Sequence, residues 1–223
     1  MSSNTTALSA SMMLYTYFRS SAAFRVRIAL NIKGLKPEQV FVHLRKQEQG
    51  ADKYRELNPQ ALLPTLVHEG HAIGQSLAII EYLEELVPEP PLLPADALGR
   101  ARVRQIAYAM ACEIHPLGNL RVQNYLRDTL GHSEAEVLTW HRHWMALGFE
   151  AIEKMVALAP QSGKFCHGDE PTLADICLVP QMANARRIEL SLSPYPTLLK
   201  IERAAYKLAA FDQAQPKKQP DAE

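Results

Sequence analysis

Tyr17-Phe18-Arg19-Ser20-Ser21-Ala22-Ala23-Phe24-Arg25 is the segment in which an apolar strand is predicted to turn, through two serines, into a helix. We expect the strand over residues 14–18 and the helix over residues 21–33, with Gly34 as its left-handed stop. The free amides and the dipole at a helix N-terminus stabilise an anion. The two hydroxyl groups therefore predict an anion site at Ser20 and Ser21.

The pattern that follows predicts a small mixed sheet. Residues 39–44 alternate apolar and polar side chains, and a short helix is expected near Tyr54. Residues 62–68 and 71–73 are typical of a hairpin turning at Glu69-Gly70. Ser76 is an N-cap candidate for a helix over residues 76–87. The resulting order, β-α-β-(α)-β-β-α, predicts a thioredoxin-like domain.

A proline-rich segment, Pro88-Glu89-Pro90-Pro91-Leu92-Leu93-Pro94, interrupts this pattern. Beyond it only helical periodicity remains, over residues 98–130, 134–158, 172–187 and 195–209, and a frayed tail is expected from Gln215. The predicted fold class is an α/β thioredoxin-like N-terminal domain over residues 12–92 and an all-α C-terminal domain over residues 96–214.

Composition excludes several functional classes. Lys plus Arg and Asp plus Glu both number 24, so no bulk charge favours nucleic acid or an anionic membrane. No apolar run reaches the roughly 20 residues that span a bilayer, and the N-terminus does not resemble a signal peptide. The three cysteines form no CxxC pair, which favours reduced thiols in the cytoplasm. His141 and His143 lie on different sides of a helix, so we expect no metal site.

Five separated motifs stand out along the chain. They are Arg19-Ser20-Ser21-x-x-Phe24-Arg25-Val26-Arg27, Asn58-Pro59 with Leu63-Pro64-Thr65-Leu66, Gln75-Ser76-Leu77-Ala78-Ile79, Ile114-His115-Pro116-Leu117-x-Asn119-Leu120-Arg121 and Val179-Pro180-Gln181-x-x-Asn184-Ala185-Arg186-Arg187. With these motifs the chain, from about residue 14 to residue 211, resembles the zeta class of glutathione transferases, including its maleylacetoacetate and maleylpyruvate isomerases. This resemblance implies the glutathione transferase fold, glutathione as cofactor and a homodimer.

The resemblance assigns thiol activation to Ser20, with Ser21 as the alternative. A thiol pKa near 8.5 leaves a few per cent thiolate at neutral pH, and lowering it by two units requires about 2.7 kcal/mol. A hydroxyl hydrogen bond and the helix amides could together supply that energy. The simpler interpretation is that both serines only cap the helix.

Other residues are expected to bind glutathione. Leu63-Pro64 resembles the cis-proline turn of thioredoxin-like folds, which would turn the Leu63 backbone toward the ligand. Gln75 and Ser76 would meet the γ-glutamyl carboxylate at a second helix N-terminus. The resemblance adds Gln49, His115 and Asn119.

The resemblance also implies a small dicarboxylate substrate held by Arg19, Arg121 and Arg187, because guanidinium groups bind carboxylates bidentately. Ala22 and Ala23 depart from the family, which often carries Cys or Thr, and Ser or Thr, at these two positions. The favoured function is cis–trans isomerisation of an enedioate through thiolate addition, rotation and elimination. A transferase that conjugates or dehalogenates small halogenated acids and a non-catalytic glutathione-binding module remain alternatives.

Overall fold

The computed structural model describes residues 8–223, which form two compact units. The thioredoxin-like unit comprises the described residues up to Pro91 together with Leu208–Glu223. The helical unit comprises Leu92–Lys207.

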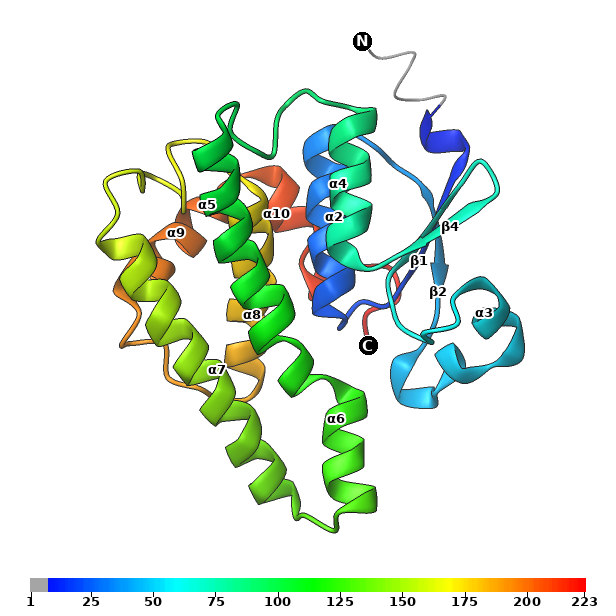
Figure 1. The fold of residues 1–223 in the computed structure, drawn as a ribbon. Helices are drawn as coiled ribbons and strands as arrows, with labels where there is room; N and C mark the ends of the chain where they lie inside the picture. The colour runs from blue at the N-terminus through cyan, green and yellow to red at the C-terminus, as the bar shows by residue number, and fades with distance from the viewer. Residues whose placement is uncertain (1–7) are drawn as a thin grey trace. The chain divides into compact units, whose positions relative to one another are not determined.

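A four-stranded sheet with the order β2-β1-β3-β4 forms the centre of the thioredoxin-like unit (Figure 1). Strand β1 (Met12–Thr16) pairs in parallel with β2 (Glu38–Phe41) and antiparallel with β3 (Thr65–His68), which forms a hairpin with β4 (His71–Gly74). Tyr15 lies opposite Thr65 in this register, so the end of β1 is beside the start of β3. The predicted thioredoxin-like order is confirmed.

Three helices complete this pattern: α2 (Ser21–Lys33), α3 (Asp52–Leu57) and α4 (Ser76–Leu86). Helices α2 and α4 pack side by side (Figure 1), and α4 also contacts β3 and β4. Gly34 ends α2 at φ 68°, as the sequence predicts. The fully buried core of this unit includes Leu14, Val26, Ile28, Leu66, Ile79 and Leu83.

The C-terminal segment belongs to the thioredoxin-like unit, which corrects two expectations. Helix α10 (Ala209–Gln213) contacts α2, and a 3-10 turn covers Pro216–Lys218. Phe211 is fully buried, and the carboxylate of Asp221 accepts a hydrogen bond from the Phe18 backbone N–H at 2.8 Å. The expected frayed tail is therefore wrong, and residues 208–214 group with the first unit rather than with the helices. Phe18 and Asp221, which form this hydrogen bond, are about 200 residues apart in the sequence.

The helical unit contains α5 (Ala97–Tyr108), α6 (Leu120–Asn124), α7 (Glu134–Ala157), α8 (Leu173–Arg187) and α9 (Pro196–Ala205). The single helix expected over residues 98–130 is wrong. Two π-helical segments, Ala109–Ile114 and Tyr125–Thr129, and a 3-10 turn at Pro116–Gly118 divide it. Pro116 cannot donate a backbone hydrogen bond, and Asn119 starts α6 anew as its N-cap.

Candidate functional site

Ser20 lies in the predicted place, at the N-cap of α2. Its Oγ accepts a hydrogen bond from the Ala23 N–H at 3.2 Å, and its own N–H donates to Tyr17 O at 3.0 Å. A serine hydroxyl that accepts through one lone pair still has its proton to donate. The first turn of α2, all of which lies within residues 8–223, contains no acidic residue. No side-chain charge in this turn therefore neutralises the positive end of the helix dipole. Ser20 is thus a cap and a hydroxyl donor at once.

Ser21 and the two alanines differ in exposure. Ser21 is the first residue of α2 and is buried, whereas Ser20 is half-buried. Ala22 is half-buried, but Ala23 is fully enclosed in the core. The departure from the family at Ala23 therefore changes the interior, and only Ala22 presents a methyl group toward the surface beside the serines.

The side chain of Arg25, in α2, contacts the N-terminus of α4. Its side chain is 2% exposed, and Nη1 donates to Ser76 Oγ at 3.2 Å. Ser76 is the first residue of α4, while Gln75 is the N-cap and makes no side-chain capping bond. The prediction of Ser76 as N-cap is therefore wrong, because its hydroxyl is oriented by Arg25 instead. A buried positive charge carried by α2 thus lies beside the start of α4.

The Leu63-Pro64 peptide bond is cis, as predicted. The loop around it is held by Tyr54 and Asn58, which both hydrogen bond to Leu62 O and to Thr65 Oγ1 at 2.7–3.0 Å. Leu63 is buried in a cluster with Tyr17, Phe18, Val42 and Tyr54. This cluster packs the proline loop against the turn that leads to Ser20.

Gln49 and Gln75 each show a feature that suits a ligand contact. The Gln49 Oε1 atom is buried and has no hydrogen-bond partner among residues 8–223. Gln75 is exposed and has φ 66°, a conformation that non-glycine residues rarely adopt and that costs about 1–3 kcal/mol. Its Nε2 donates to Gln60 Oε1 at 2.8 Å, which orders the side chain.

Arg19 is the second central residue of the turn from Tyr17 to Ser20 and is half-buried. Burial raises the pKa of the Tyr17 phenol, and the nearby positive charge of Arg19 partly opposes this increase. Arg19 is thus the predicted substrate residue that belongs to the thioredoxin-like unit.

The remaining predicted residues belong to the helical unit, and three of them lie on one short segment. His115 is half-buried and precedes the Pro116–Gly118 turn, and Arg121 is exposed in α6. Asn119 Oδ1 accepts from the Arg121 N–H at 3.0 Å. Asn119 therefore caps α6 through one lone pair of its oxygen, and its amide nitrogen is a donor for the predicted cofactor contact.

Arg187 reaches the same region through His141. Arg187 is exposed at the end of α8, and its charge contributes to lowering the pKa of His141 to about 4, after the larger effect of burial. His141 in turn packs against Gly118, where an added Cβ would lie 2.1 Å from His141 Nε2. The neighbouring Arg186 is different, because both its terminal nitrogens pair with the buried Glu202 carboxylate.

Neither a metal centre nor a membrane span emerges from the described residues. Within residues 8–223, no group of three His, Cys, Asp or Glu side chains is arranged to hold a metal ion. No helix in this range is long and apolar enough to cross a membrane.

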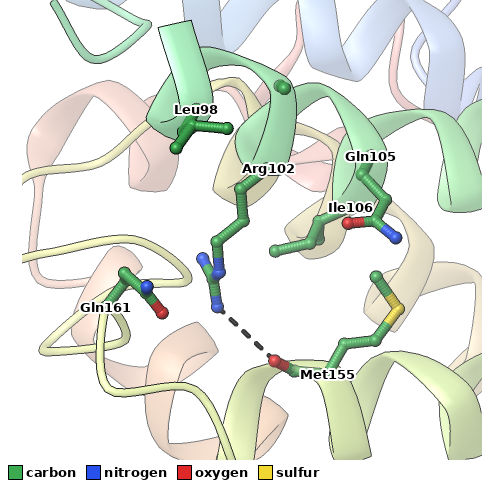
Figure 2. Close-up of a pocket in the computed structure, with 7 residues that line it drawn as sticks. Leu98, Arg102, Gln105, Ile106, Met155 and Gln161 are labelled. Atoms are coloured by element: carbon green, nitrogen blue, oxygen red, sulfur yellow. Dashed lines mark hydrogen bonds between the residues drawn. The ribbon is translucent and has the colours of Figure 1, made fainter. Parts of the chain in front are cut away.

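A separate pocket lies in the helical unit, and the polar side chain inside it has a structural role. Figure 2 shows its lining, from α5, α7 and the loop after α7, and it includes no predicted site residue. Arg102 points into it, but the guanidinium donates to Cys166 O at 2.7 Å, Ser162 Oγ at 2.9 Å and Met155 O at 3.5 Å. These bonds hold the loop of residues 158–168 in place.

Sequence reasoning missed the buried charges of this region. Arg25, Arg27 and Lys33 are at most 3% exposed, and their burial was not predicted. Their position among apolar residues of one helix was a signal of burial. Charged side chains are fully buried almost only when they are paired, so this position also predicts partners for them. Asp221 gave no signal, because it lies in a polar tail.

The comparisons with known proteins agree with this geometry. A protein-family model, glutathione S-transferase N-terminal domain, matches residues 14–91. A maleylpyruvate isomerase of a Ralstonia species is 47% identical over 94% of this chain and 99% of its own length.

Two solved structures are similar over nearly the whole chain. The holo structure of a maleylpyruvate isomerase, a bacterial zeta-class glutathione S-transferase, has a TM-score of 0.93 and 46% identity, and the match covers 95% of this chain and 100% of that one. A maleylacetoacetate isomerase of Methylobacterium extorquens AM1, solved with malonate and glutathione bound, has a TM-score of 0.92 and 36% identity, with 95% and 99% covered.

Proposed function

Because the chain belongs to the maleylacetoacetate and maleylpyruvate isomerase family of zeta-class glutathione transferases, we infer that it is a glutathione-dependent cis–trans isomerase of enedioates. The observation that carries the site assignment is the Ser20 hydroxyl at the N-cap of α2. It combines a hydroxyl proton with a helix N-terminus whose described first turn contains no acidic residue.

The thioredoxin-like unit fits glutathione as its cofactor. The unpartnered Gln49 Oε1 is an acceptor that a ligand N–H would satisfy, since buried polar atoms are rarely left without a partner. We propose that Gln75 and Ser76 hold a carboxylate at the start of α4, whose described first turn also lacks acidic residues. The Leu63 backbone beside Pro64 is proposed to pair with the backbone of the cofactor.

When bound, glutathione supplies the thiolate that adds to the cis double bond and departs after rotation. The contribution of Ser20 is to keep its Oγ proton directed at the sulfur while its lone pair remains tied to the Ala23 N–H. Together with the α2 amides, this hydrogen bond is proposed to supply about 2.7 kcal/mol of preference for the thiolate, which is worth two pKa units. Ser21 is buried and is the alternative to Ser20 as the hydroxyl that activates the thiol.

Carboxylate binding is proposed for Arg19, Arg121 and Arg187. Arg121 and Arg187 are exposed, and the adjacent Arg186 pairs with the buried Glu202. The Methylobacterium relative binds malonate, a small dicarboxylate, which supports an anionic substrate for this chain. His115 and the Asn119 amide nitrogen are proposed as cofactor contacts from the helical unit.

We further propose that the protein acts as a cytoplasmic homodimer, as its family membership suggests. All three cysteines are free thiols, which suits a reducing compartment. Light scattering coupled to size exclusion would measure the oligomeric state directly.

The test of the site is a pair of serine variants assayed with maleylacetoacetate and maleylpyruvate in the presence of glutathione. We expect Ser20→Ala to lower kcat/KM about tenfold, because it removes the hydroxyl share of the thiolate preference and leaves the α2 amides, and Ser21→Ala to have a much smaller effect. The loss of cis-enedioate absorbance measures the rate. Equal activity of Ser20→Ala and the wild type would contradict the assignment.

Arginine variants test the substrate half. Arg187→Ala should raise the KM for the enedioate about tenfold, because a charge-assisted carboxylate contact is lost. Arg203→Ala, which removes an exposed arginine of α9, is the matched control and should behave as the wild type. Turnover of small halogenated acids in place of both enedioates would favour the transferase alternative, and glutathione binding without any turnover would favour a binding module.

A further inference from the structure

The turn that carries Ser20 is held at its first central residue, Phe18. The Phe18 N–H donates to Asp221 Oδ2 at 2.8 Å, and the Phe18 carbonyl accepts from Arg27 Nη2 at 3.1 Å. Both backbone polar groups of this residue are therefore fixed by charged side chains. The next bond in the turn, from Ser20 N to Tyr17 O, sets the position of the serine itself.

Arg27 extends this support to the C-terminal segment. Its guanidinium also donates to Tyr17 O at 3.4 Å and to Ala214 O at 3.2 Å. Burial lowers the pKa of Arg27 to about 10, and the charge of Asp221 opposes that effect. Arg27 and Asp221 thus have opposite charges and bind the same residue of the turn, Arg27 at the Phe18 carbonyl and Asp221 at the Phe18 N–H.

The segment that delivers Asp221 is anchored on both sides of it. Before Asp221, Asn31 Nδ2 donates to Ala210 O at 2.9 Å, and Lys218 pairs with Asp212 at 2.6 Å. After it, Glu223 pairs with His43 at 2.7 Å. The carboxylate is therefore placed by an ordered chain, which limits how far it can move from the Phe18 amide.

We propose that Asp221 is a positioning residue of the isomerase, which fixes the turn from Tyr17 to Ser20 and thereby aims the Ser20 hydroxyl. This inference rests on the proposed role of Ser20. A hydrogen bond from an amide to a carboxylate is roughly twice as strong as one between neutral groups. A displacement of a catalytic group by about 1 Å can cost up to a hundredfold in rate, so a support bond is expected to appear in kcat.

The experiment compares Asp221→Ala with Asp221→Asn in the full chain. The alanine variant loses the acceptor, and we expect kcat to fall about tenfold while the KM for the enedioate changes less than about twofold. The pKa of the glutathione thiol bound to the protein, followed by the ultraviolet absorbance of the thiolate, should rise in the same variant. The asparagine variant retains an oxygen at the same distance and should recover most of both losses.

Two further variants separate positioning from general damage. Glu38→Ala removes an exposed carboxylate of the same unit, at the start of β2, and it should keep the wild-type kcat and thiol pKa. Asp221→Glu keeps the charge beside Arg27 but moves the oxygen, so it should fold and yet resemble Asp221→Ala in kcat. Thermal unfolding of each variant reports whether it folds.

Three results would overturn the inference: wild-type kcat and thiol pKa in Asp221→Ala, equal impairment of the alanine and asparagine variants, or full activity of Asp221→Glu. Ser20→Ala is assayed in parallel. If Ser20→Ala is impaired and Asp221→Ala is not, only the role of Asp221 fails. If Ser20→Ala is fully active, the proposed serine role fails and the role of Asp221 fails with it.

Discussion

Three basic side chains of α2 are buried, and oxygen atoms of the same unit hold each of them. Arg25 donates to Ser76, Arg27 to backbone carbonyls at the end of β1, and Lys33 to Glu84 at 2.6 Å and to the carbonyls of Pro88 and Pro90. Burying a charge is tolerated only with such partners. Helix α2 therefore connects several segments of its unit through these hydrogen bonds, and Ser20 lies at its N-cap.

His141 is the buried residue whose ionisation should make stability depend on pH. Its pKa is about 4 in the folded protein, mainly because of burial, whereas an unfolded histidine titrates near 6.5. Between these values the unfolded state binds the proton more readily. The stabilisation is therefore complete above pH 6.5 and is lost as the pH falls toward 4, by up to about 3 kcal/mol.

Urea unfolding between pH 4 and pH 7.5 measures this contribution. His141→Gln removes the titrating group, so its free energy of unfolding should fall less steeply toward acid than that of the wild type. His143→Gln, at the exposed neighbour, is the control and should follow the wild-type profile. Parallel curves for the wild type and His141→Gln would refute this assignment.

At this scale the site residues could be predicted only through their motifs. The hydroxyls of Ser20 and Ser76 and the cis Leu63-Pro64 bond occupy the places that the motifs suggest. The partner that orients each group could not be predicted, because a sequence does not show that the guanidinium of Arg25 reaches Ser76. For the same reason Ser76 was mistaken for an N-cap.

Among the elements, α8 shows how one carboxylate fixes a helix start. Asp175 is fully buried and accepts from the Thr172 N–H at 2.8 Å, the Thr172 hydroxyl at 3.0 Å and the Cys166 N–H at 2.8 Å. The two bonds from Thr172 cap the start of α8, and the third bond extends this cap to the preceding loop. Removing this acceptor would leave three buried donors without a partner.

We expect Asp175→Ala to lower the free energy of unfolding by about 3 kcal/mol or more, because an unsatisfied buried donor costs about 1–3 kcal/mol. Denaturant unfolding of the full chain measures this loss. Asp169→Ala is the control, since that exposed carboxylate accepts one bond, from the Lys164 N–H at 3.0 Å, and should cost less than about 1 kcal/mol. Equal destabilisation by the two substitutions would contradict a special role of Asp175.

The existence of most helices could be predicted from periodicity, but the interruptions of the first long helix could not. Apolar residues recur at helical spacing through residues 98–130, so periodicity gives no sign of the π-helical segments. Pro116 was a signal for a break. It was outweighed by the pattern on either side, and the 3-10 turn at this proline shows that the local rule should have prevailed.

On the scale of the whole molecule, the thioredoxin-like unit is discontinuous in sequence. A fragment of residues 8–91 would lack Phe211, which is fully buried, as well as the acceptors that Ala214 and Asp221 supply. We expect this fragment to lack a cooperative thermal transition, because burial of a Phe side chain alone contributes about 1.5–3 kcal/mol. Joining residues 208–223 to it through a flexible Gly/Ser linker should restore the transition.

Circular dichroism during heating distinguishes the two chains. A linker-joined chain that carries Phe211→Ala is the matched control and should resemble the bare fragment. The same cooperative midpoint in the fragment and in the joined chain would show that the C-terminal segment is dispensable for folding. Family resemblance could predict the fold class, but this return of the chain depends on contacts about 200 residues apart that no local pattern records.

The placement of the thiols has a redox consequence. Cys112 is exposed, Cys166 and Cys177 are buried, and burial raises the pKa of the Cys166 thiol well above its usual value. All three belong to the helical unit, and the thioredoxin-like unit contains no cysteine. A thiolate attacks disulfides readily, and mixed disulfides form by that exchange. Within the thioredoxin-like unit, no protein thiol can therefore attack the disulfide of an oxidised cofactor, so this unit cannot form a mixed disulfide with it.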